Sequence, residues 1–422
     1  MSSERITVLH TRIVSGTGGG PEKTILNSPR FLEGTKWREE ALYLHAPGDP
    51  GIEVLRERAR ERRCPFHTLA DRWPLDPRTL KRCAELCREL GVVIWHGHDY
   101  KSNLFGVLLR RYCDLRLFTT VHGWVKYTAR TPLYFAVDRW AIKRHEEVVC
   151  VSQDLFDECA RFGVPAERLT LIENAIDTEE FRRAGPPSAA PLRAEKSSAP
   201  SPAGSATPAG LATPAGSAPS KSAATKSSTA PSNALGPTPA GRLVVGAVGR
   251  LSEEKGFHHL IAAVERCVER GLDLELWIAG EGDQQARLEA QIAASKHAAR
   301  LKLLGFRKDA KALFEAMDVF ALSSLREGLP NVVLEAMAME VPVLATRCGG
   351  MEAFAKDEED ALLVGVDSAD ELERGVARLA TDSALRARLA TTARAKIERD
   401  YSFARRMQRF AELYERMLAR PR

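Results

Sequence analysis

The first part of the chain alternates short apolar runs with segments of mixed polarity. RITVLHTRIV (5–14) and VVIWHGH (92–98) are rich in β-branched and aromatic residues, which predicts buried strands. The charged segments 51–63 and 76–90 predict helices. Further strands are expected at 41–45, 117–122 and 148–152, and a further helix at 101–112. Continuous apolar strands alternating with helices are typical of a parallel sheet covered on both faces, so 1–182 is predicted to be a doubly wound, Rossmann-like domain.

The last part of the chain repeats this pattern. Strands are predicted at 242–249, 274–280, 301–305, 319–323 and 341–346, with helices at 257–271 and 284–295 and a short one near 311. A second Rossmann-like domain is therefore expected over 242–400. The terminal segment 401–422 carries Phe403, Met407, Phe410 and Tyr414 on one helical face. Such an apolar stripe requires a packing partner, and we expect this helix to pack back on the first domain.

The segment 183–241 between the two domains has a different composition. It is rich in Ala, Pro and Ser, and the hexapeptide pattern (S/T)PAG(S/L)A occurs three times in tandem over 201–218. A segment with so few large apolar residues cannot offset its ordering entropy by burial. We expect a disordered insertion in the linker between the domains.

Polar and glycine-rich segments follow several predicted strands. Gly18, Gly19 and Gly20 follow the first strand, and His122 follows a later one. His98 and Asp99 follow the strand before it. Ligands of open parallel sheets bind outside the carboxyl ends of the strands, so these residues are expected along one rim. A plain tight turn is the alternative for the glycines, and a buried strand-end histidine for His122. The missing GxGxxG pattern disfavours an NAD-dependent oxidoreductase.

In the second half, Glu327-Gly-Leu-Pro-Asn-Val-Val-Leu-Glu335 combines two acids with an abrupt change to apolar residues. Pro330 is suited to a helix start, and a helix is predicted over about 331–339. Glu327 then lies on the preceding loop and Glu335 one turn inside the helix. Free N–H groups at a helix start bind anions, and flanking acids accept from hydroxyls. The stretch therefore suits a sugar nucleotide, although a buried helix with two incidental acids is the alternative.

Composition narrows the function classes. The 422 residues are 44% hydrophobic and 28% charged, with a formal net charge of +5, which does not indicate a nucleic-acid binder. The eight cysteines show no metal-type CxxC spacing, and a reducing cytoplasm is the simplest setting. The first ten residues lack the apolar core of a signal peptide, and no run of eighteen apolar residues is present.

Five elements in order carry a family resemblance. They are Gly18-Gly19-Gly20, Thr119-Thr-Val-His122-Gly123, Glu173-Asn174-Ala-Ile-Asp177, Gly249-Arg250 with Lys255-Gly256, and the E-x7-E pair Glu327 and Glu335. Outside the insertion, the chain resembles the retaining glycosyltransferases of the GT-B fold, family 4 type (glycosyl transferases group 1). The resemblance implies two Rossmann-like domains facing a cleft, with an acceptor-side first domain and a nucleotide-sugar donor domain second.

The resemblance also implies roles at the donor site. Arg250 and Lys255 would stabilise the departing diphosphate, since fixed cations stabilise developing negative charge. Glu327 would contact the donor sugar and Glu335 the ribose hydroxyls. His122 would lie beside the transferred sugar. The remaining donor-binding positions are Gly18, Gly19 and Gly20 in the first domain, with Phe306, Arg307, Gly328, Leu329, Pro330 and Asn331 in the second.

Two features bear on the chemistry. No DxD motif stands on a loop between apolar strands, so a divalent metal site is not expected. The resemblance implies a metal-independent reaction with retention and without a cofactor, the nucleotide sugar being a substrate. The family usually has Gly-Gly-x-Pro-Glu after its next strand. This chain has Gly349-Gly350-Met351-Glu352, one residue shorter, which leaves the geometry of that loop open.

We therefore expect transfer of a hexosyl unit from a UDP- or GDP-sugar to a glycan or lipid-linked acceptor, in cell-envelope or exopolysaccharide biosynthesis. His98 and Asp99 are candidates for the acceptor side. The alternatives are a non-catalytic sugar-nucleotide or glycan-binding subunit, and a UDP-sugar epimerase of the same fold. Residues 101–145 hold nine Lys or Arg against two Asp. This excess indicates either a solvated helix face or a peripheral contact with an anionic membrane, at the inner face of the cytoplasmic membrane.

Overall fold

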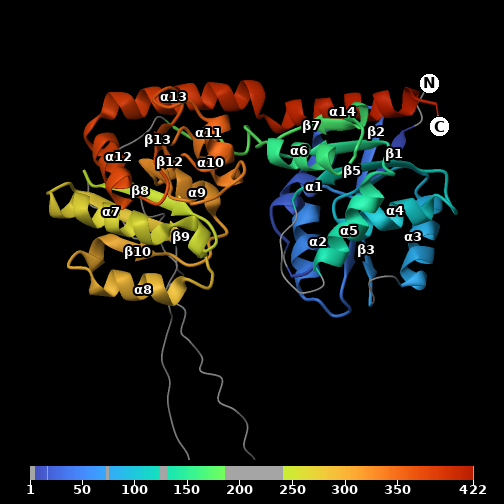
Figure 1. The fold of residues 1–422 in the computed structure, drawn as a ribbon, viewed down its shortest axis with the longest axis horizontal. Coiled ribbons are helices and arrows are strands. Elements are labelled where there is room, and N and C mark those ends of the chain that lie inside the picture. The colour runs from blue at the N-terminus through green and yellow to red at the C-terminus, as the bar shows by residue number, and fades with distance from the viewer. Residues whose placement is uncertain (1–4, 17, 73–75, 124–130, 186–240, 422) are drawn as a thin grey trace, which may run out of the picture.

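The computed structural model describes residues 5–16, 18–72, 76–123, 131–185 and 241–421. Two α/β domains lie side by side, the first built from the N-terminal half of the chain and the second from the C-terminal half (Figure 1). Nearly all of the predicted insertion, 186–240, lies outside the described residues.

The first sheet has seven parallel strands in the order β3-β2-β1-β4-β5-β6-β7. The strands are β1 (Ile6–Val14), β2 (Trp37–His45), β3 (Phe66–Ala70), β4 (Val92–Gly97), β5 (Arg116–Val121), β6 (Glu147–Cys150) and β7 (Leu169–Leu171). Neighbouring residues of one strand face opposite sides of the sheet: Val8 joins one apolar cluster and Leu9 another. Burial on both faces explains why apolar residues of these strands face either side of the sheet.

Helices cover both faces of this sheet. They are α1 (Gly20–Phe31), α2 (Gly51–Glu61), α3 (Pro77–Glu89), α4 (Tyr100–Leu109), α5 (Thr131–Ile142) and α6 (Gln153–Arg161), with a 3₁₀ turn, η1 (Ala166–Arg168), before β7. Three of these helices begin at side-chain caps. Asp76, Asp99 and Ser152 accept from backbone N–H groups of the first turns of α3, α4 and α6. These caps fix where the chain turns from strand to helix at the edge that carries the predicted site residues.

The second sheet has six parallel strands in the order β10-β9-β8-β11-β12-β13. Its strands are β8 (Leu243–Val248), β9 (Leu274–Ala279), β10 (Leu301–Leu303), β11 (Val319–Leu322), β12 (Val343–Thr346) and β13 (Leu362–Val364). The helices are α7 (Phe257–Glu269), α8 (Gln285–Ala294), α9 (Ala310–Glu315), α10 (Asn331–Ala338), α11 (Gly350–Phe354) and α12 (Ala369–Thr381), with 3₁₀ turns η2 (Glu253–Lys255) and η3 (Ala298–Arg300).

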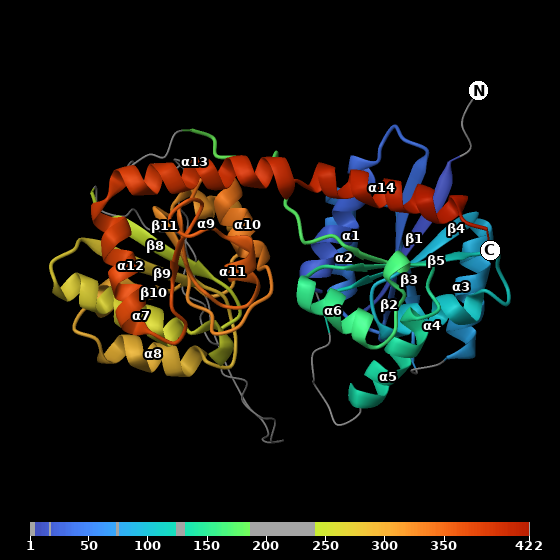
Figure 2. The same cartoon turned by 45° about the horizontal axis from the view of Figure 1, so that its top comes forward.

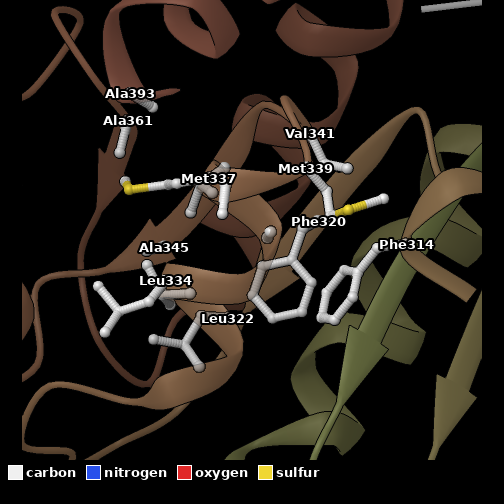
Figure 3. Close-up of a cluster of buried hydrophobic side chains, with 14 of the residues drawn as sticks. Phe314, Phe320, Leu322, Leu334, Met337, Met339, Val341, Ala345, Ala361 and Ala393 are labelled. Atoms are coloured by element: carbon white, nitrogen blue, oxygen red, sulfur yellow. The ribbon is translucent and has the colours of Figure 1, made fainter. Parts of the chain in front are cut away.

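An apolar core lies on each face of the second sheet. One contains residues of α7, α8 and α12, and the other contains residues of α9, α10 and α11. Figure 3 shows part of the core on the α10 face of the sheet, where Leu334 of α10 lies beside Leu322 of β11. The ring of Phe314 lies 5.8 Å from that of Phe320. This core anchors α10, and with it the predicted donor-site stretch.

Two long helices, α13 (Ser383–Asp400) and α14 (Phe403–Ala419), run one after the other along the same side of both domains (Figures 1 and 2). α13 packs on the second domain, where Ala393 and Ile397 join the core beneath α10. α14 crosses to the first domain, where Phe410 and Tyr414 pack against strand residues. At the crossing, the backbone of Ile176 pairs with that of Ser402.

Some elements lie where the hydrophobic pattern predicted none. β3, β7 and β13 have only three to five residues, too few to show a period. α5, α6, α12 and α13 were also not predicted. The buried face of α13 mixes the aliphatic Leu385, Leu389 and Ile397 with Ala390, Ala393 and Arg394. β2 begins at Trp37, four residues before the predicted start at 41. The early part of the strand was not predicted because it contains the acidic residues Glu39 and Glu40, which are buried. Because buried carboxylates are rare, two adjacent acidic residues do not suggest a buried strand.

Candidate functional site

The stretch from Glu327 to Glu335 forms a loop and the start of α10, as predicted. Pro330 is the N-cap residue with φ −76° and ψ 130°, one position before the first helical turn in which it was expected. Glu335 is 1% exposed within α10, whereas Glu327 remains half-buried on the loop. The helix start therefore presents free N–H groups between the two acids.

A cation from the neighbouring loop meets Glu327. β8 and β11 are adjacent strands, so the loops that follow them share one edge of the sheet. The Nζ atom of Lys255 forms an ion pair with the Glu327 carboxylate, and the Ser324 hydroxyl donates to the same carboxylate at 3.2 Å. Gly256 allows this approach because its φ is +60° and a Cβ atom there would lie 2.2 Å from the carbonyl oxygen of Ser323.

The short loop after β12 forms a wall of the same site. Gly349 has φ +44°, and a Cβ atom there would lie 2.3 Å from the carbonyl oxygen of Glu327. The Gly350 N–H donates to that oxygen at 3.0 Å. The Gly349–Glu352 segment, whose geometry the sequence left open, therefore packs directly on the backbone of the Glu327 loop.

The other predicted donor residues lie along the same rim. Arg250 follows β8 and is exposed. Phe306 and Arg307 lie between β10 and α9, two strands away from β8. Phe306 is 52% exposed, and the Arg307 side chain donates to Asp309 at 2.8 Å. The structure thus brings Lys255 to Glu327, while Arg250 follows β8 and Phe306 and Arg307 follow β10.

The first domain contributes its glycine-rich loop to this site. α1 and α10 lie on the sides of the two domains that face each other (Figures 1 and 2). Lys23 Nζ of α1 donates to Glu335 Oε1 at 2.7 Å. A Cβ atom on Gly20 would lie 3.4 Å from Asn331 Nδ2. The structure therefore places the Gly18–Gly20 loop against the start of α10.

His122 lies at the carboxyl edge of the first sheet, after β5, and is half-buried. Its Nε2 atom is 3.0 Å from Nδ1 of His98. Burial, with the nearby Arg12 and Arg406 guanidinium groups, holds the pKa of His122 well below its usual range, so its ring is neutral. The described contacts of His122 lie within the first domain, and its place beside the transferred sugar stays a prediction.

His98 and Asp99, the candidates for the acceptor side, have internal partners in this structure, and their acceptor role stays a prediction. His98 is 5% exposed, and both ring nitrogens contact other histidines. One Asp99 oxygen caps α4 by accepting from the N–H groups of Lys101 and Ser102, and the other accepts from the Ile13 N–H at 2.6 Å. The sequence could not separate these internal partners from a rim position, because both follow the end of a strand.

Lys23, Glu22 and Asn174 were not among the predicted site residues, although Asn174 belongs to the Glu173–Asp177 element of the family resemblance. Lys23 bonds to Glu335, as described above. Glu22 is 1% exposed, pairs with Arg12 at 2.6 Å and accepts from the Gly19 N–H. Asn174 donates to the Leu329 carbonyl at 3.5 Å. Lys23 and Glu22 belong to the glycine-rich run, so their position in it was the available signal.

One group of described residues has the composition of a metal site. Potential ligand atoms of His10, His96 and His98 lie within 4.8 Å of one another in the first domain. All three side chains are buried, at 0 to 5% exposed. This cluster is separate from the Lys255–Glu327 pair, which lies in the second domain.

Comparisons with known proteins agree with this geometry. Residues 18–180 match the model described as Glycosyltransferase Family 4, and residues 236–396 match Glycosyl transferases group 1. The chain is 37% identical over 153 residues to the lipopolysaccharide core biosynthesis glycosyltransferase LpsE of Rhizobium meliloti, which covers 36% of this chain and 44% of that relative. The chain thus spans less than half of LpsE.

Two longer matches extend the comparison. The chain is 23% identical to the UDP-Gal:alpha-D-GlcNAc-diphosphoundecaprenol alpha-1,3-galactosyltransferase of Escherichia coli, over 80% of this chain and 79% of that one. HepE of Anabaena, solved in complex with UDP, has the same fold, with a TM-score of 0.72 at 20% identity over 97% of this chain and 100% of that one. With family models matched in both domains, the chain belongs to the group 1 glycosyltransferases, family 4 type, of the GT-B fold.

Proposed function

We propose that this protein is a metal-independent, retaining glycosyltransferase that moves a hexosyl unit from a UDP- or GDP-sugar to a glycan or lipid-linked acceptor. The observation that carries the proposal is the pairing of Lys255 with Glu327 beside the start of α10, with Glu335 buried in the same helix. A cation, free N–H groups and two carboxylates converge there, as a nucleotide sugar requires.

The charge arrangement suits departure of a nucleoside diphosphate. As the bond from the anomeric carbon to the phosphate oxygen breaks, negative charge develops on the diphosphate. Lys255, Arg250 and the N–H groups of Gly328, Leu329 and Asn331 stabilise that charge, because fixed donors need no reorganisation. The acceptor hydroxyl forms the new bond on the same face of the sugar, and its proton passes to the departing phosphate. Glu335 accepts hydrogen bonds from the ribose hydroxyls.

In the present state two of these groups are engaged with protein partners. Lys255 is paired with Glu327, and Glu335 with Lys23. A bound donor exchanges these partners: the diphosphate takes Lys255, a sugar hydroxyl takes Glu327 and the ribose takes Glu335. The Lys23 side chain is 61% exposed, so releasing it from Glu335 costs little.

The names of the relatives support a role in cell-envelope glycan synthesis, with a glycan or lipid-linked acceptor. We also propose a peripheral contact with an anionic membrane surface at the cytoplasmic face. Leu133 and Trp140 of α5 are 64% and 42% exposed, and the Arg144 guanidinium lies 3.8 Å from the Trp140 ring centroid. An exposed apolar and basic face suits such lipid headgroups. No helix in the described ranges has the length and apolarity needed to cross a bilayer.

The test is turnover of a panel of UDP- and GDP-sugars in the presence of EDTA. We expect at least one donor to be hydrolysed or transferred with an undiminished rate under chelation, and the product to keep the donor's anomeric configuration by NMR. Loss of turnover on chelation contradicts metal independence, and inversion contradicts retention. Binding without any turnover across donors and glycan acceptors favours the non-catalytic subunit.

A further inference from the structure

A chain of buried polar side chains leads from the interior of the first domain to His122. His122 Nε2 is 3.0 Å from His98 Nδ1. His98 Nε2 is 2.9 Å from His10 Nδ1. His10 Nε2 is 3.3 Å from Oε1 of Glu39. The four residues come from β2, β1 and the ends of β4 and β5, on the face of the sheet that α14 covers.

Because these four side chains form a partly buried row, the ring nitrogen that carries each histidine proton is set by its neighbours. Glu39 is 2% exposed and His10 is 4% exposed, so their polar atoms depend on protein partners. Among the described ion pairs of Glu39, the partner is His10, and the Tyr414 hydroxyl donates to the same oxygen at 3.3 Å. Burial, then the neighbouring His96, His10, His122 and Arg12, holds the pKa of His98 well below its usual range. His98 and His122 are therefore neutral, each with one N–H and one bare nitrogen.

The positions of the protons follow from Glu39 outward. Glu39 Oε1 has no proton to donate and lies 3.3 Å from His10 Nε2, a close contact outside hydrogen-bond geometry, so the geometry points to a single ring proton of His10 on Nε2, facing the carboxylate, with Nδ1 bare. A hydrogen bond between two ring nitrogens needs one proton, so His98 carries its proton on Nε2. By the same argument His98 Nδ1 accepts from Nε2–H of His122. The remaining nitrogen of His122, Nδ1, is then bare and accepts hydrogen bonds.

We propose that Glu39 is a positioning residue that, through His10 and His98, holds His122 as the Nε2–H tautomer with Nδ1 free to accept from a hydroxyl of the transferred sugar. The step to the sugar hydroxyl rests on the proposed function, whereas the tautomer itself is a property of the chain alone. A carboxylate that fixes the tautomer of a working histidine is a general device of enzyme sites. Here two further histidines lie between the carboxylate and the working ring.

A metal ion held by His10, His96 and His98 is the competing explanation, and the ring geometry opposes it. The His96 and His98 rings stack with centroids 4.3 Å apart and planes 19° apart. A histidine donates to a metal in the plane of its ring, so stacked rings do not aim at one point. Both His96 nitrogens also have partners, Tyr414 Oη at 3.0 Å and Thr120 Oγ1 at 2.8 Å.

The test reads the tautomers directly, in the full chain without substrate. Long-range ¹⁵N–¹H correlation of ¹⁵N-histidine protein at pH 7.5 distinguishes Nδ1–H from Nε2–H, and single His→Asn variants assign the signals. We expect His98 and His122 to be Nε2–H tautomers and the purified protein to contain no stoichiometric metal. Nδ1–H on His122, or one metal ion per chain that perturbs these signals, overturns the proposal.

A matched pair of variants tests the part played by Glu39. Glu39→Gln replaces a pure acceptor by an amide that can also donate to His10, so we expect an Nδ1–H signal of His122 to appear. Glu40→Gln changes the adjacent carboxylate, which is equally buried at 2% exposed but bonds to His67 at 2.6 Å. We expect it to leave His122 unchanged. Identical His122 spectra in the two variants overturn the role of Glu39. The wild-type spectrum decides the tautomer even if a variant does not fold.

The link to the sugar is tested separately, by kinetics with a donor that the wild-type protein turns over. We expect Glu39→Gln to lower kcat several-fold with KM nearly unchanged, relative to Glu40→Gln. Equal kcat in the two variants, with the tautomer changed, removes the sugar-facing role of His122 but leaves the tautomer assignment standing. If no donor is turned over, the proposed function fails while the spectra still stand.

Discussion

The two domains share one architecture but place their polar groups differently. In the second domain, Glu327 and Glu335 lie eight positions apart in one loop and helix, above an apolar core. In the first domain, the polar groups lie inside the sheet–helix interface and come from distant parts of the chain. His10 belongs to β1, His96 to β4 and Tyr414 to α14. Polar groups can therefore gather at the rim above an apolar core, as in the second domain, or inside the core itself, as in the first.

This difference has an energetic consequence. The core under α10 is mostly apolar, and its buried charged groups have partners: Glu335 pairs with Lys23, and Arg394 donates to the Ala338 carbonyl. Lys255 and Glu327 lie at the rim above it, where a ligand can exchange their partners. The first domain holds Glu39 and several histidines in a space where each polar atom needs a partner. The described residues of the second domain include no buried histidine. We therefore expect the domains to respond differently to pH and to substitution.

The largest expected difference is in stability at acid pH. Burial holds the pKa values of His96 and His98 well below 6.5, and lowers that of His145 to about 4. The unfolded chain binds these protons near pH 6.5 and the folded domain does not. The contribution of these three histidines to the folding free energy is therefore fully present above pH 6.5 and is lost as the pH falls below it. Each histidine contributes about 1.4 kcal/mol per pH unit, so we expect the first domain to lose about 4 kcal/mol at pH 5.5.

Amide hydrogen exchange measures the stability of each domain separately at the two pH values. At pH 5.5, after correction for intrinsic rates, the amides of β4 and β5 should lose protection relative to pH 7.5 while those of β8 and β11 change little. Equal loss in both sheets would show that the buried histidines are not the cause.

Next in size is the loss of the cation at the donor site. Lys255→Ala should lower kcat by about 10²- to 10³-fold, as removal of one preorganised charge-stabilising group does in other enzymes. Steady-state kinetics with an active nucleotide sugar measures this. Lys356→Ala is the control, because that side chain is 71% exposed in the same domain. Near-normal turnover in Lys255→Ala would show that the ion pair with Glu327 is only structural.

A smaller effect is expected at His122. One hydrogen bond to the sugar is worth about 1 kcal/mol, so His122→Ala should reduce kcat roughly 5- to 10-fold with little change in nucleotide affinity. The comparison of kcat with the Kd of UDP or GDP separates these quantities. A variant with intact transfer would remove His122 from the donor site.

The smallest effect is expected for the bond between the domains. The Lys23 side chain is 61% exposed, so Lys23→Ala should change the free energy of unfolding by less than about 1 kcal/mol. Denaturant titration monitored by circular dichroism measures this change. A loss of several kcal/mol would mean that the Lys23–Glu335 pair holds the domains together and is not exchanged with a donor.

The local structure around the predicted site residues was predicted better in the second domain than in the first, because the second domain's residues are close in sequence. Local signals, namely a proline, a glycine and an apolar run, predict the loop that carries Glu327, the helix that carries Glu335 and the loop that carries Lys255. The strand ends that bear His98 and His122 were also predicted. Their partners were not, because pairing of His10 with His98 and of Tyr414 with His96 depends on strand order and on α14 crossing back, neither of which local patterns encode.

Two features of particular residues defeated the hydrophobic pattern. Glu39 and Glu40 are charged yet 2% exposed, so the strand that includes them was predicted to start only at 41. Asp99 follows a strand as a rim residue does, yet its carboxylate caps α4. In both cases the decisive fact is a partner distant in the sequence or a backbone N–H, and composition shows neither.

The proposed function requires that the rim of the second domain bind a nucleotide. Isothermal titration of UDP and GDP in EDTA tests this directly. We predict saturable 1:1 binding of at least one nucleotide to the wild-type protein, at least tenfold weaker binding to Glu335→Ala, and unchanged binding to Glu289→Ala on the exposed face of α8. Absence of binding, or equal affinity in wild type and Glu335→Ala, would contradict the account.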